Sequence, residues 1–251
     1  MMVKRVAGAL GAELQAVNLG DGFDAELAGT LRALLNKHEV LFLRDQNIEP
    51  AAQKALAAIF GPLQTHPAYN TVEGLPEVMI LESTPENPSK IEVWHSDMTF
   101  RQHPPSVTVL RGITIPEVGG DTLFASMTAA YDALSSAMQR YLDGLVAVHD
   151  FSHGFKESLA APGGRERLAD ALTANPPVRH PVVQTHPETG KKVLFVMPCL
   201  RLTLRVYHRW SQLRSCSFCG ATPACPSSPV ALTGHQTAWS SGITAAPSTS
   251  P

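Results

Sequence analysis

The acidic residues of this chain stop abruptly, and that limits how much of it can fold as an ordinary globular domain. All 22 Asp and Glu residues lie at or before Glu188, although the chain continues to Pro251. All four cysteines fall in the last fifth of the chain, which is also rich in Ser, Pro, Thr and Ala. A segment of that length with average composition contains several acidic residues. A break in composition this sharp marks a boundary between two parts of the chain.

The overall composition is that of a soluble globular protein. Hydrophobic residues make up 44% of the 251 residues and charged residues 17%, with a formal net charge of −2. That charge offers no basic surface for nucleic acid or for an anionic membrane, and no apolar run approaches the ~20 residues of a membrane-spanning helix. The first apolar segment is short and is broken by Gly8 and Gly11, unlike a signal peptide. We expect a cytoplasmic protein without nucleic-acid or membrane partners.

Hydrophobic periodicity predicts a mixture of short strands and helices. Apolar alternation or short apolar runs predict strands, and helical spacing of Leu residues after Asp24, a suitable N-cap, predicts the first helix. The predicted strands cover residues 13–19, 40–43, 78–81, 107–110, 121–124, 145–149 and 193–196, and the predicted helices residues 24–37, 50–60 and 127–142. Short strands with irregular loops and helices weighted to the first half indicate an α+β fold around a β-sandwich or barrel.

One short motif carries metal-binding chemistry. His95 and Asp97 stand two residues apart among strand-favouring residues, so a strand would turn both side chains to the same face. An imidazole and a carboxylate are two of the three ligands in the 2-His-1-carboxylate triad of non-haem Fe(II) sites. Trp94 and Phe100 flank the pair and could form its apolar shell. The alternative for a lone His-x-Asp is a hydrogen-bonded pair on a sheet.

The chain resembles the taurine dioxygenase family of Fe(II)- and 2-oxoglutarate-dependent oxygenases over about residues 1–198. The resemblance is specific because the matching segments are many and occur in the same order. These segments are 40–46 (VLFLRDQ), 61–63 (GPL) with His66-Pro67, 94–100 (WHSDMTF), 119–123 (GGDTL), 149–151 (HDF) and 180–191 (HPVVQTHPETGK). It implies a double-stranded β-helix (jelly-roll) core with helical insertions, and a protein that forms dimers or tetramers.

The resemblance assigns a role to each candidate residue. His95 and Asp97 match two of the three Fe(II) ligands, and Thr122 matches the threonine that hydrogen-bonds 2-oxoglutarate. The substrate-pocket residues of the family match His66, Tyr69 and Phe155. Without the resemblance, Thr122 would be interpreted as a strand hydroxyl after a Gly-Gly turn, and His66 as a surface-loop histidine.

The implied reaction consumes O2 and 2-oxoglutarate and yields succinate and CO2. The hydroxylated carbon of the substrate carries the sulfur group, and the product separates into an aldehyde and sulfite or sulfate. Ile91 stands where taurine-specific members carry Asn, and its side chain forms no hydrogen bonds. We therefore predict a less polar substrate than taurine, an alkyl sulfonate or alkyl sulfate ester. A related reaction on a non-sulfur acid of the chlorophenoxyacetate type is the second candidate.

The resemblance implies an incomplete catalytic domain over residues 1–198 and an aberrant tail over residues 199–251, because the tail lacks the motifs that the family needs. Three interpretations of the tail compete. The family supplies its third ligand from a segment like Trp-Asp-Asn-Arg-x-Thr-Gln-His, followed by an Arg that pairs with 2-oxoglutarate; neither appears after residue 198. The tail could be a zinc site, a disordered extension rich in Ser and Pro, or a frameshifted segment. The zinc ligands would be Cys216, Cys219, Cys225 and His235, but no second Cys pair follows the first.

Back-translation favours the frameshift. When the third base of each codon of residues 241–249 (SGITAAPST) is joined to the first two bases of the next, the fixed bases permit Trp-Asp-His/Asn-Arg-x-Thr-Gln-His. That is the distal-histidine motif of the family. The sequence therefore predicts a lineage of iron dioxygenases. It also leaves open that this polypeptide is an inactive pseudoenzyme or a non-catalytic jelly-roll binding protein.

Overall fold

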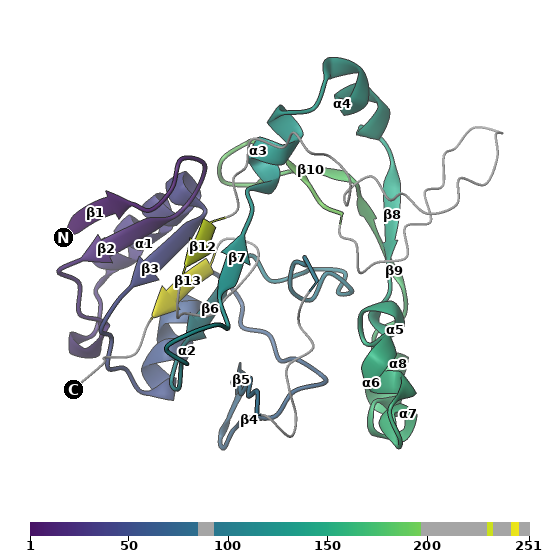
Figure 1. The fold of residues 1–251 in the computed structure, drawn as a ribbon, viewed down its shortest axis with the longest axis horizontal. Coiled ribbons are helices and arrows are strands. Elements are labelled where there is room, and N and C mark those ends of the chain that lie inside the picture. Colours follow the sequence, from purple (N-terminus) through teal and green to yellow (C-terminus); the bar gives the residue numbers. More distant parts are fainter. Residues whose placement is uncertain (85–92, 197–229, 233–241, 246–251) are drawn as a thin grey trace.

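The computed structural model describes residues 1–84 and 93–196, together with the backbone of two short strands at 230–232 and 242–245. Figure 1 shows an N-terminal sheet with its helices at one end, the β8–β9 ladder with short helices at the other, and β7 and α3 between them. The predicted domain boundary at residue 198, Ile91 and the four cysteines lie outside the described residues.

The N-terminal sheet has five strands in the order β1-β2-β3-β13-β6. These strands are β1 (Met2–Arg5), β2 (Ala12–Gln15), β3 (Val40–Leu43), β13 (Gly242–Ala245) and β6 (Thr108–Arg111). β1 and β2 are antiparallel, whereas β2–β3, β3–β13 and β13–β6 are parallel pairs. All four residues of β3 are buried, as expected for a short continuous apolar run in the interior of a sheet.

Helix α1 (Ala25–His38) follows the predicted pattern closely. The Asp24 carboxylate accepts a hydrogen bond of 2.8 Å from the Leu27 amide, which satisfies one of the free N–H groups at the helix start. Leu31 and Leu35 on its inner face are buried against β2 and β3, in a core that also contains Leu41 and Leu56. Burial of each such side chain contributes roughly 1.5–3 kcal/mol. Helix α2 (Pro50–Ala58) begins at a proline, as predicted.

The second half of the described chain is built from short elements. Two-stranded ladders pair β4 with β5, β7 with β12, β8 with β9 and β10 with β11. Four short helices follow β8 and pack around Phe151, Leu159 and Leu168. The remaining elements are η1 (Leu19–Asp21), β4 (Thr71–Val72), β5 (Leu75–Met79), β7 (Thr122–Phe124), α3 (Met127–Asp132), α4 (Ser136–Leu142), β8 (Val146–His149), α5 (Phe151–Gly154), α6 (Lys156–Ala160), α7 (Gly164–Arg167), α8 (Ala169–Ala174), β9 (Val178–Pro181), β10 (Val183–Thr185), β11 (Lys192–Leu194) and β12 (Val230–Leu232).

Several predicted boundaries differ from the structure. The helix predicted over residues 127–142 is divided into α3 and α4, because the Ser135 hydroxyl caps a new helix start by accepting a hydrogen bond from the Met138 amide. The prediction of mixed α+β structure is confirmed, but the described strands form one open sheet and four two-stranded ladders, without a closed barrel. No helix among the described residues is long and apolar enough to span a membrane.

A buried histidine in the β8–β9 ladder makes stability depend on pH. His149 is fully buried; its ring stacks on Phe195 at 5.3 Å and meets the His180 ring edge-on at 4.8 Å. Burial and the nearby His180 lower the pKa of His149 to about 4, although the Phe195 backbone opposes them. The unfolded chain therefore binds a proton more readily than the folded chain between the ordinary pKa of histidine and pH 4.

We predict that the free energy of unfolding falls as the pH drops from about 6.5 to 4, and that His149 accounts for up to about 3 kcal/mol of that fall. The variant His149→Phe removes this contribution, so its urea-unfolding free energy should depend less on pH than that of the parent. Replacement of the exposed His103 by Phe is the control and should leave the pH dependence as it is. Equal slopes for the parent and His149→Phe would contradict the prediction.

Candidate metal and substrate site

The His-x-Asp motif lies in a loop, not in the predicted strand. Residues 94–96 have no regular structure, and a turn begins at Asp97. Met98 takes a left-handed conformation with φ of 48°, which ends any extended run at that point. The side chains of His95 and Asp97 are therefore brought together by the conformation of a loop and not by the alternation of a strand.

The two candidate ligand atoms face one another. His95 Nε2 lies 3.4 Å from Asp97 Oδ1. His95 Nδ1 lies 2.8 Å from the Val93 carbonyl, to which it donates, so Nε2 is the nitrogen left to face the carboxylate. Burial lowers the pKa of His95, but hydrogen bonds to Asp97 and Val93 and the charge of Asp97 outweigh it and raise that pKa overall. Nε2 is thus placed to hold either a proton or a cation against Asp97.

This arrangement fits a divalent metal ion. Bonds of about 2.1 Å from nitrogen and oxygen to one ion allow the two ligand atoms to be up to about 4.2 Å apart, and the pair lies within that limit. The second polar atom of each group is also held. His95 Nδ1 donates to the Val93 carbonyl, and Asp97 Oδ2 accepts a hydrogen bond of 2.8 Å from the Thr108 hydroxyl. Such outer partners orient metal ligands in proteins. Among the described residues no third His, Cys, Asp or Glu joins the pair.

The three predicted substrate residues lie together beside this pair, in a group that we call the aromatic cluster (His66, Tyr69, Phe100, Phe151 and Phe155). The His66 ring lies 4.5 Å from the Tyr69 ring and 5.5 Å from the Phe155 ring. Phe100 meets His66 edge-on at 5.8 Å and packs against Phe151 at 5.0 Å. The aromatic cluster therefore reaches from the loop at residue 66, through the turn after Asp97, to helix α5.

Burial keeps the polar groups of the aromatic cluster neutral. It lowers the pKa of His66 to about 4; the charge of Asp97 opposes this shift, and that of Arg101 adds to it. His66 Nδ1 accepts a hydrogen bond from the Ala68 amide at 3.1 Å, so in neutral His66 the ring proton is on Nε2. Burial and Asp97 also raise the pKa of Tyr69. Near neutral pH the site thus offers an N–H and an O–H donor within electrostatic reach of Asp97.

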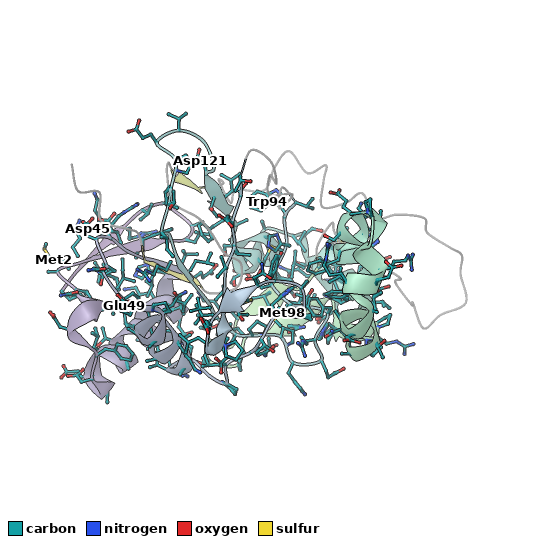
Figure 2. The ribbon with its side chains drawn as sticks, turned by 90° about the horizontal axis from the view of Figure 1, so that it is seen from below. Met2, Asp45, Glu49, Trp94, Met98 and Asp121 are labelled. Carbon is teal, nitrogen blue, oxygen red and sulfur yellow. The ribbon has the colours of Figure 1, made fainter. Side chains whose placement is uncertain are left out.

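The other predicted site residues have mixed outcomes. Phe100 is 8% exposed, as the predicted apolar shell requires, but Trp94 is 41% exposed, so that half of the prediction is wrong. In Figure 2 the labelled Trp94 and Met98 lie between the N-terminal sheet and the helices that follow β8. Thr122 is buried at the start of β7, next to β12. Within the described part of the chain no hydrogen bond joins it to the pair, and its role as a co-substrate contact stays a prediction.

Two polar contacts at the site could not be anticipated from local patterns. Thr108 stands in a predicted strand, and nothing in its pattern indicates that its hydroxyl meets Asp97. His180 was predicted only as part of a matching segment, yet its Nε2 lies 2.9 Å from the Thr99 carbonyl and 3.0 Å from the Arg101 carbonyl. The Thr108 contact joins residues 11 apart in the sequence and the His180 contacts join residues 81 and 79 apart, beyond the spacing that local patterns encode.

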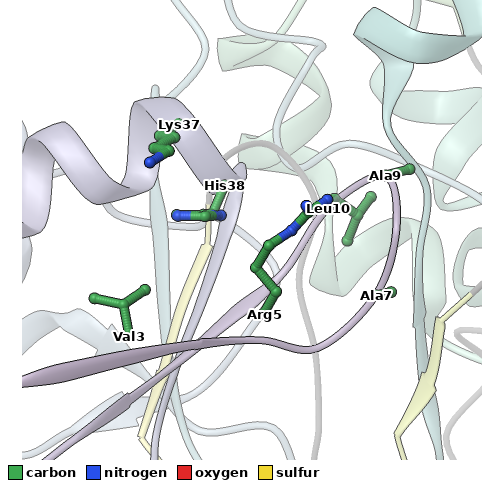
Figure 3. A pocket seen from close by; sticks show the side chains of 7 residues that line it. All are labelled: Val3, Arg5, Ala7, Ala9, Leu10, Lys37 and His38. Atoms are coloured by element: carbon green, nitrogen blue, oxygen red, sulfur yellow. The ribbon is translucent and has the colours of Figure 1, made fainter.

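A cavity of about 440 Å³ lies elsewhere, between the N-terminal strand and the end of helix α1. Figure 3 shows the basic side chains in its lining, Arg5, Lys37 and His38. Burial and the charges of Lys37 and Arg5 lower the pKa of His38. Lys37 stands in the last turn of α1, where its positive charge complements the free carbonyls of the helix end. Arg5 already donates to the Gly8 carbonyl at 2.6 Å. These charges have a structural explanation, so we keep the His95–Asp97 pair as the candidate site.

Comparison with known proteins identifies the family of this chain. The family described as taurine catabolism dioxygenase TauD, TfdA family matches residues 3–209. The chain belongs to this family. It is 32% identical over 200 residues to an alkylsulfatase of Acinetobacter baylyi, with 78% of this chain and 62% of the relative covered. It is 31% identical over 196 residues to an alpha-ketoglutarate-dependent sulfate ester dioxygenase of Pseudomonas putida, with 76% and 64% covered.

A crystal structure of a taurine dioxygenase from Burkholderia xenovorans is similar to this chain at 31% identity, with a TM-score of 0.61 and coverage of 79% of this chain and 64% of the other. The described fold is therefore that of a TauD-type protein. The chain spans less than two thirds of the length of each of these three proteins.

The packing of Phe100 in the aromatic cluster should contribute strongly to the stability of the fold. Phe100 contacts both His66 and Phe151 and is buried, so Phe100→Ala should lower the free energy of unfolding by about 3–5 kcal/mol. Tyr141 is 48% exposed, and Tyr141→Ala should change it by less than about 0.5 kcal/mol. Urea denaturation of the full chain measures both. Similar losses for the two variants would show that Phe100 does not join the elements around it.

Proposed function

We propose that this chain derives from an Fe(II)- and 2-oxoglutarate-dependent dioxygenase that acts on an alkyl sulfate or alkyl sulfonate. The observation that carries the proposal is the His95–Asp97 pair, with its ligand atoms 3.4 Å apart and the far side of each group anchored. The aromatic cluster beside it supplies neutral donors and apolar ring faces. We further propose the double-stranded β-helix as the fold of the intact lineage, a cytoplasmic location and a dimeric or tetrameric assembly.

His95 and Asp97 would hold Fe(II), with neutral imidazole and carboxylate as ligands of a type that this ion accepts. Bound Fe(II), together with 2-oxoglutarate and O2, supplies the oxidising power for hydroxylation of an unactivated carbon and yields succinate and CO2. Thr122, buried at the start of β7, would donate a hydrogen bond to a 2-oxoglutarate carboxylate. The protein residues thus bind and orient the reactants.

His66 and Tyr69 would bind the anionic end of the substrate. The Nε2–H of neutral His66 and the Tyr69 hydroxyl are donors that suit sulfonate or sulfate oxygens. Phe155, in contact with both rings, would cover the adjoining alkyl chain. Ile91 lies outside the described residues, and its apolar side chain motivates the preference for an alkyl chain over the amine of taurine. Hydroxylation of the carbon next to the sulfur group then releases an aldehyde with sulfite or sulfate.

The tail after residue 198 would be a frameshifted copy of the rest of the domain. The shifted codons of residues 241–249 permit the distal-histidine motif, and this chain matches only 62% and 64% of the length of the two relatives. The third ligand and the 2-oxoglutarate-binding Arg would then be encoded in the gene but absent from this polypeptide. We therefore propose that the chain as it stands is an inactive pseudoenzyme. Resequencing of the gene through these codons tests this step.

We expect the chain as it stands to show no iron-dependent succinate formation, and a chain with the family reading frame restored after residue 198 to turn over alkyl sulfates or alkanesulfonates. In the restored chain His95→Ala and Asp97→Ala should each lower turnover by at least about 100-fold, because each removes a metal ligand. His103→Ala, an exposed histidine outside the pair, is the control. Succinate release is measured with alkyl sulfates, alkanesulfonates, taurine and a chlorophenoxyacetate.

Three outcomes would count against the proposal. A strong preference for taurine would contradict the predicted alkyl substrate, and turnover of the chlorophenoxyacetate alone would favour the second candidate substrate. Iron-dependent succinate formation by the chain as it stands would contradict the frameshift account of its inactivity.

A further inference from the structure

We propose that Thr108 and His180 are positioning residues that hold Asp97 from two sides, an inference that rests on the proposed role of Asp97 as a metal ligand. Thr108 holds the carboxylate itself, and His180 holds the turn that carries it. The two residues come from different parts of the fold, β6 of the N-terminal sheet and β9 of the β8–β9 ladder.

Thr108 fixes which carboxylate oxygen is available. Its Oγ1 donates to Asp97 Oδ2 at 2.8 Å, whereas Oδ1 is the atom that faces His95 Nε2. The side chain of Asp would otherwise rotate freely about its last bond, since that torsion has only broad minima. Thr is stiff at its first torsion because it branches at Cβ, and its backbone lies in a strand. The hydroxyl is therefore a fixed donor that favours a single orientation of the carboxylate.

His180 fixes the backbone behind Asp97. Its ring is buried, and Nε2 lies within hydrogen-bond distance of both the Thr99 and the Arg101 carbonyls, so Nε2 is the protonated nitrogen and donates to them. The packing of the ring against His149 at 4.8 Å and Phe195 at 5.3 Å sets its plane.

The turn after Asp97 depends on outside support. Met98 has φ of 48°, a conformation that is unfavourable for a non-glycine residue. Within the turn, the Arg101 amide donates to the Met98 carbonyl at 2.9 Å. From outside the turn, His180 binds two of its backbone carbonyls, Phe100 packs in the aromatic cluster, and the Arg101 side chain donates to the Thr65 carbonyl at 3.2 Å. Of these contacts, the one from His180 holds the backbone of the turn directly.

Metal affinity separates a positioning role from a general structural one. We use Mn(II) as the probe, with free Mn(II) measured by electron paramagnetic resonance on the full chain. Thr108→Val keeps the shape but removes the donor and should weaken Mn(II) binding about 10–100-fold, with little change in the urea midpoint. Thr108→Ser keeps the hydroxyl and should recover most of the affinity. Thr185→Val, at an exposed position in β10, is the matched control and should bind as the parent does.

The role of His180 can also be tested in metal-free protein, by hydrogen exchange at the Arg101 amide. His180→Phe should weaken Mn(II) binding by a similar factor, and it should speed hydrogen exchange at the Arg101 amide relative to the amides of helix α1. His180→Gln retains a side-chain N–H and should recover part of both effects, so it also covers the case in which the Phe variant folds poorly. Thr108→Val should speed exchange at Arg101 less than His180→Phe does.

The outcomes distinguish this inference from the proposed function. Unchanged Mn(II) affinity in Thr108→Val and His180→Phe, or an equal loss in Thr185→Val, would overturn the positioning role. Absence of Mn(II) binding both by the parent chain and by the chain with the restored reading frame would overturn the metal-binding function, and the exchange of the Arg101 amide would still decide whether His180 holds the turn.

Discussion

The Asp97 carboxylate is the point at which the separate parts of this structure depend on one another. One oxygen faces His95 across 3.4 Å, and the other accepts a hydrogen bond from Thr108 in the N-terminal sheet. The turn that follows is bound by His180 in the β8–β9 ladder and places Phe100 in the aromatic cluster. A loop with a left-handed Met98 has no such rigidity of its own. The candidate metal pair therefore exists only where the two ends of the fold are held together.

Burial also sets the charge state of the histidines that surround this point. His66 and His149 both have a pKa of about 4, so both rings are neutral near pH 7. The raised pKa of His95 has the opposite cause, since Asp97 favours positive charge at that ring. Burial thus keeps the His66 ring neutral against the charge of Asp97, whereas hydrogen bonds to Asp97 and Val93 raise the pKa of His95. A neutral N–H donor next to a carboxylate would suit a site for a metal ion and a nearby anionic substrate.

Local sequence signals predicted the elements whose causes are local. The cap at Asp24 and the Leu spacing after it predicted α1, and the apolar run at residues 40–43 predicted β3. The His-x-Asp pair was predicted from its spacing, but for the wrong reason, since a loop and not a strand brings the atoms together. The contacts of Thr108 and His180 could not be predicted, because each joins elements whose approach is decided by tertiary packing. The family resemblance placed His66, Tyr69 and Phe155 together where periodicity alone would not have done so.

The charge distribution implies an order in which the site can be filled. Asp97 is close enough to His66 and Tyr69 to influence their pKa values. The Asp97 carboxylate would therefore repel an anionic substrate bound to these two donors. A divalent cation held by His95 and Asp97 would reverse the sign of the local charge and remove that repulsion. Metal binding should therefore precede binding of the anion. With two proposed protein ligands, the affinity for the metal would depend strongly on how rigidly those two are held. The hydrogen bonds from Thr108 and His180 thus bear on substrate binding as well as on the metal, although neither residue belongs to the proposed substrate contacts.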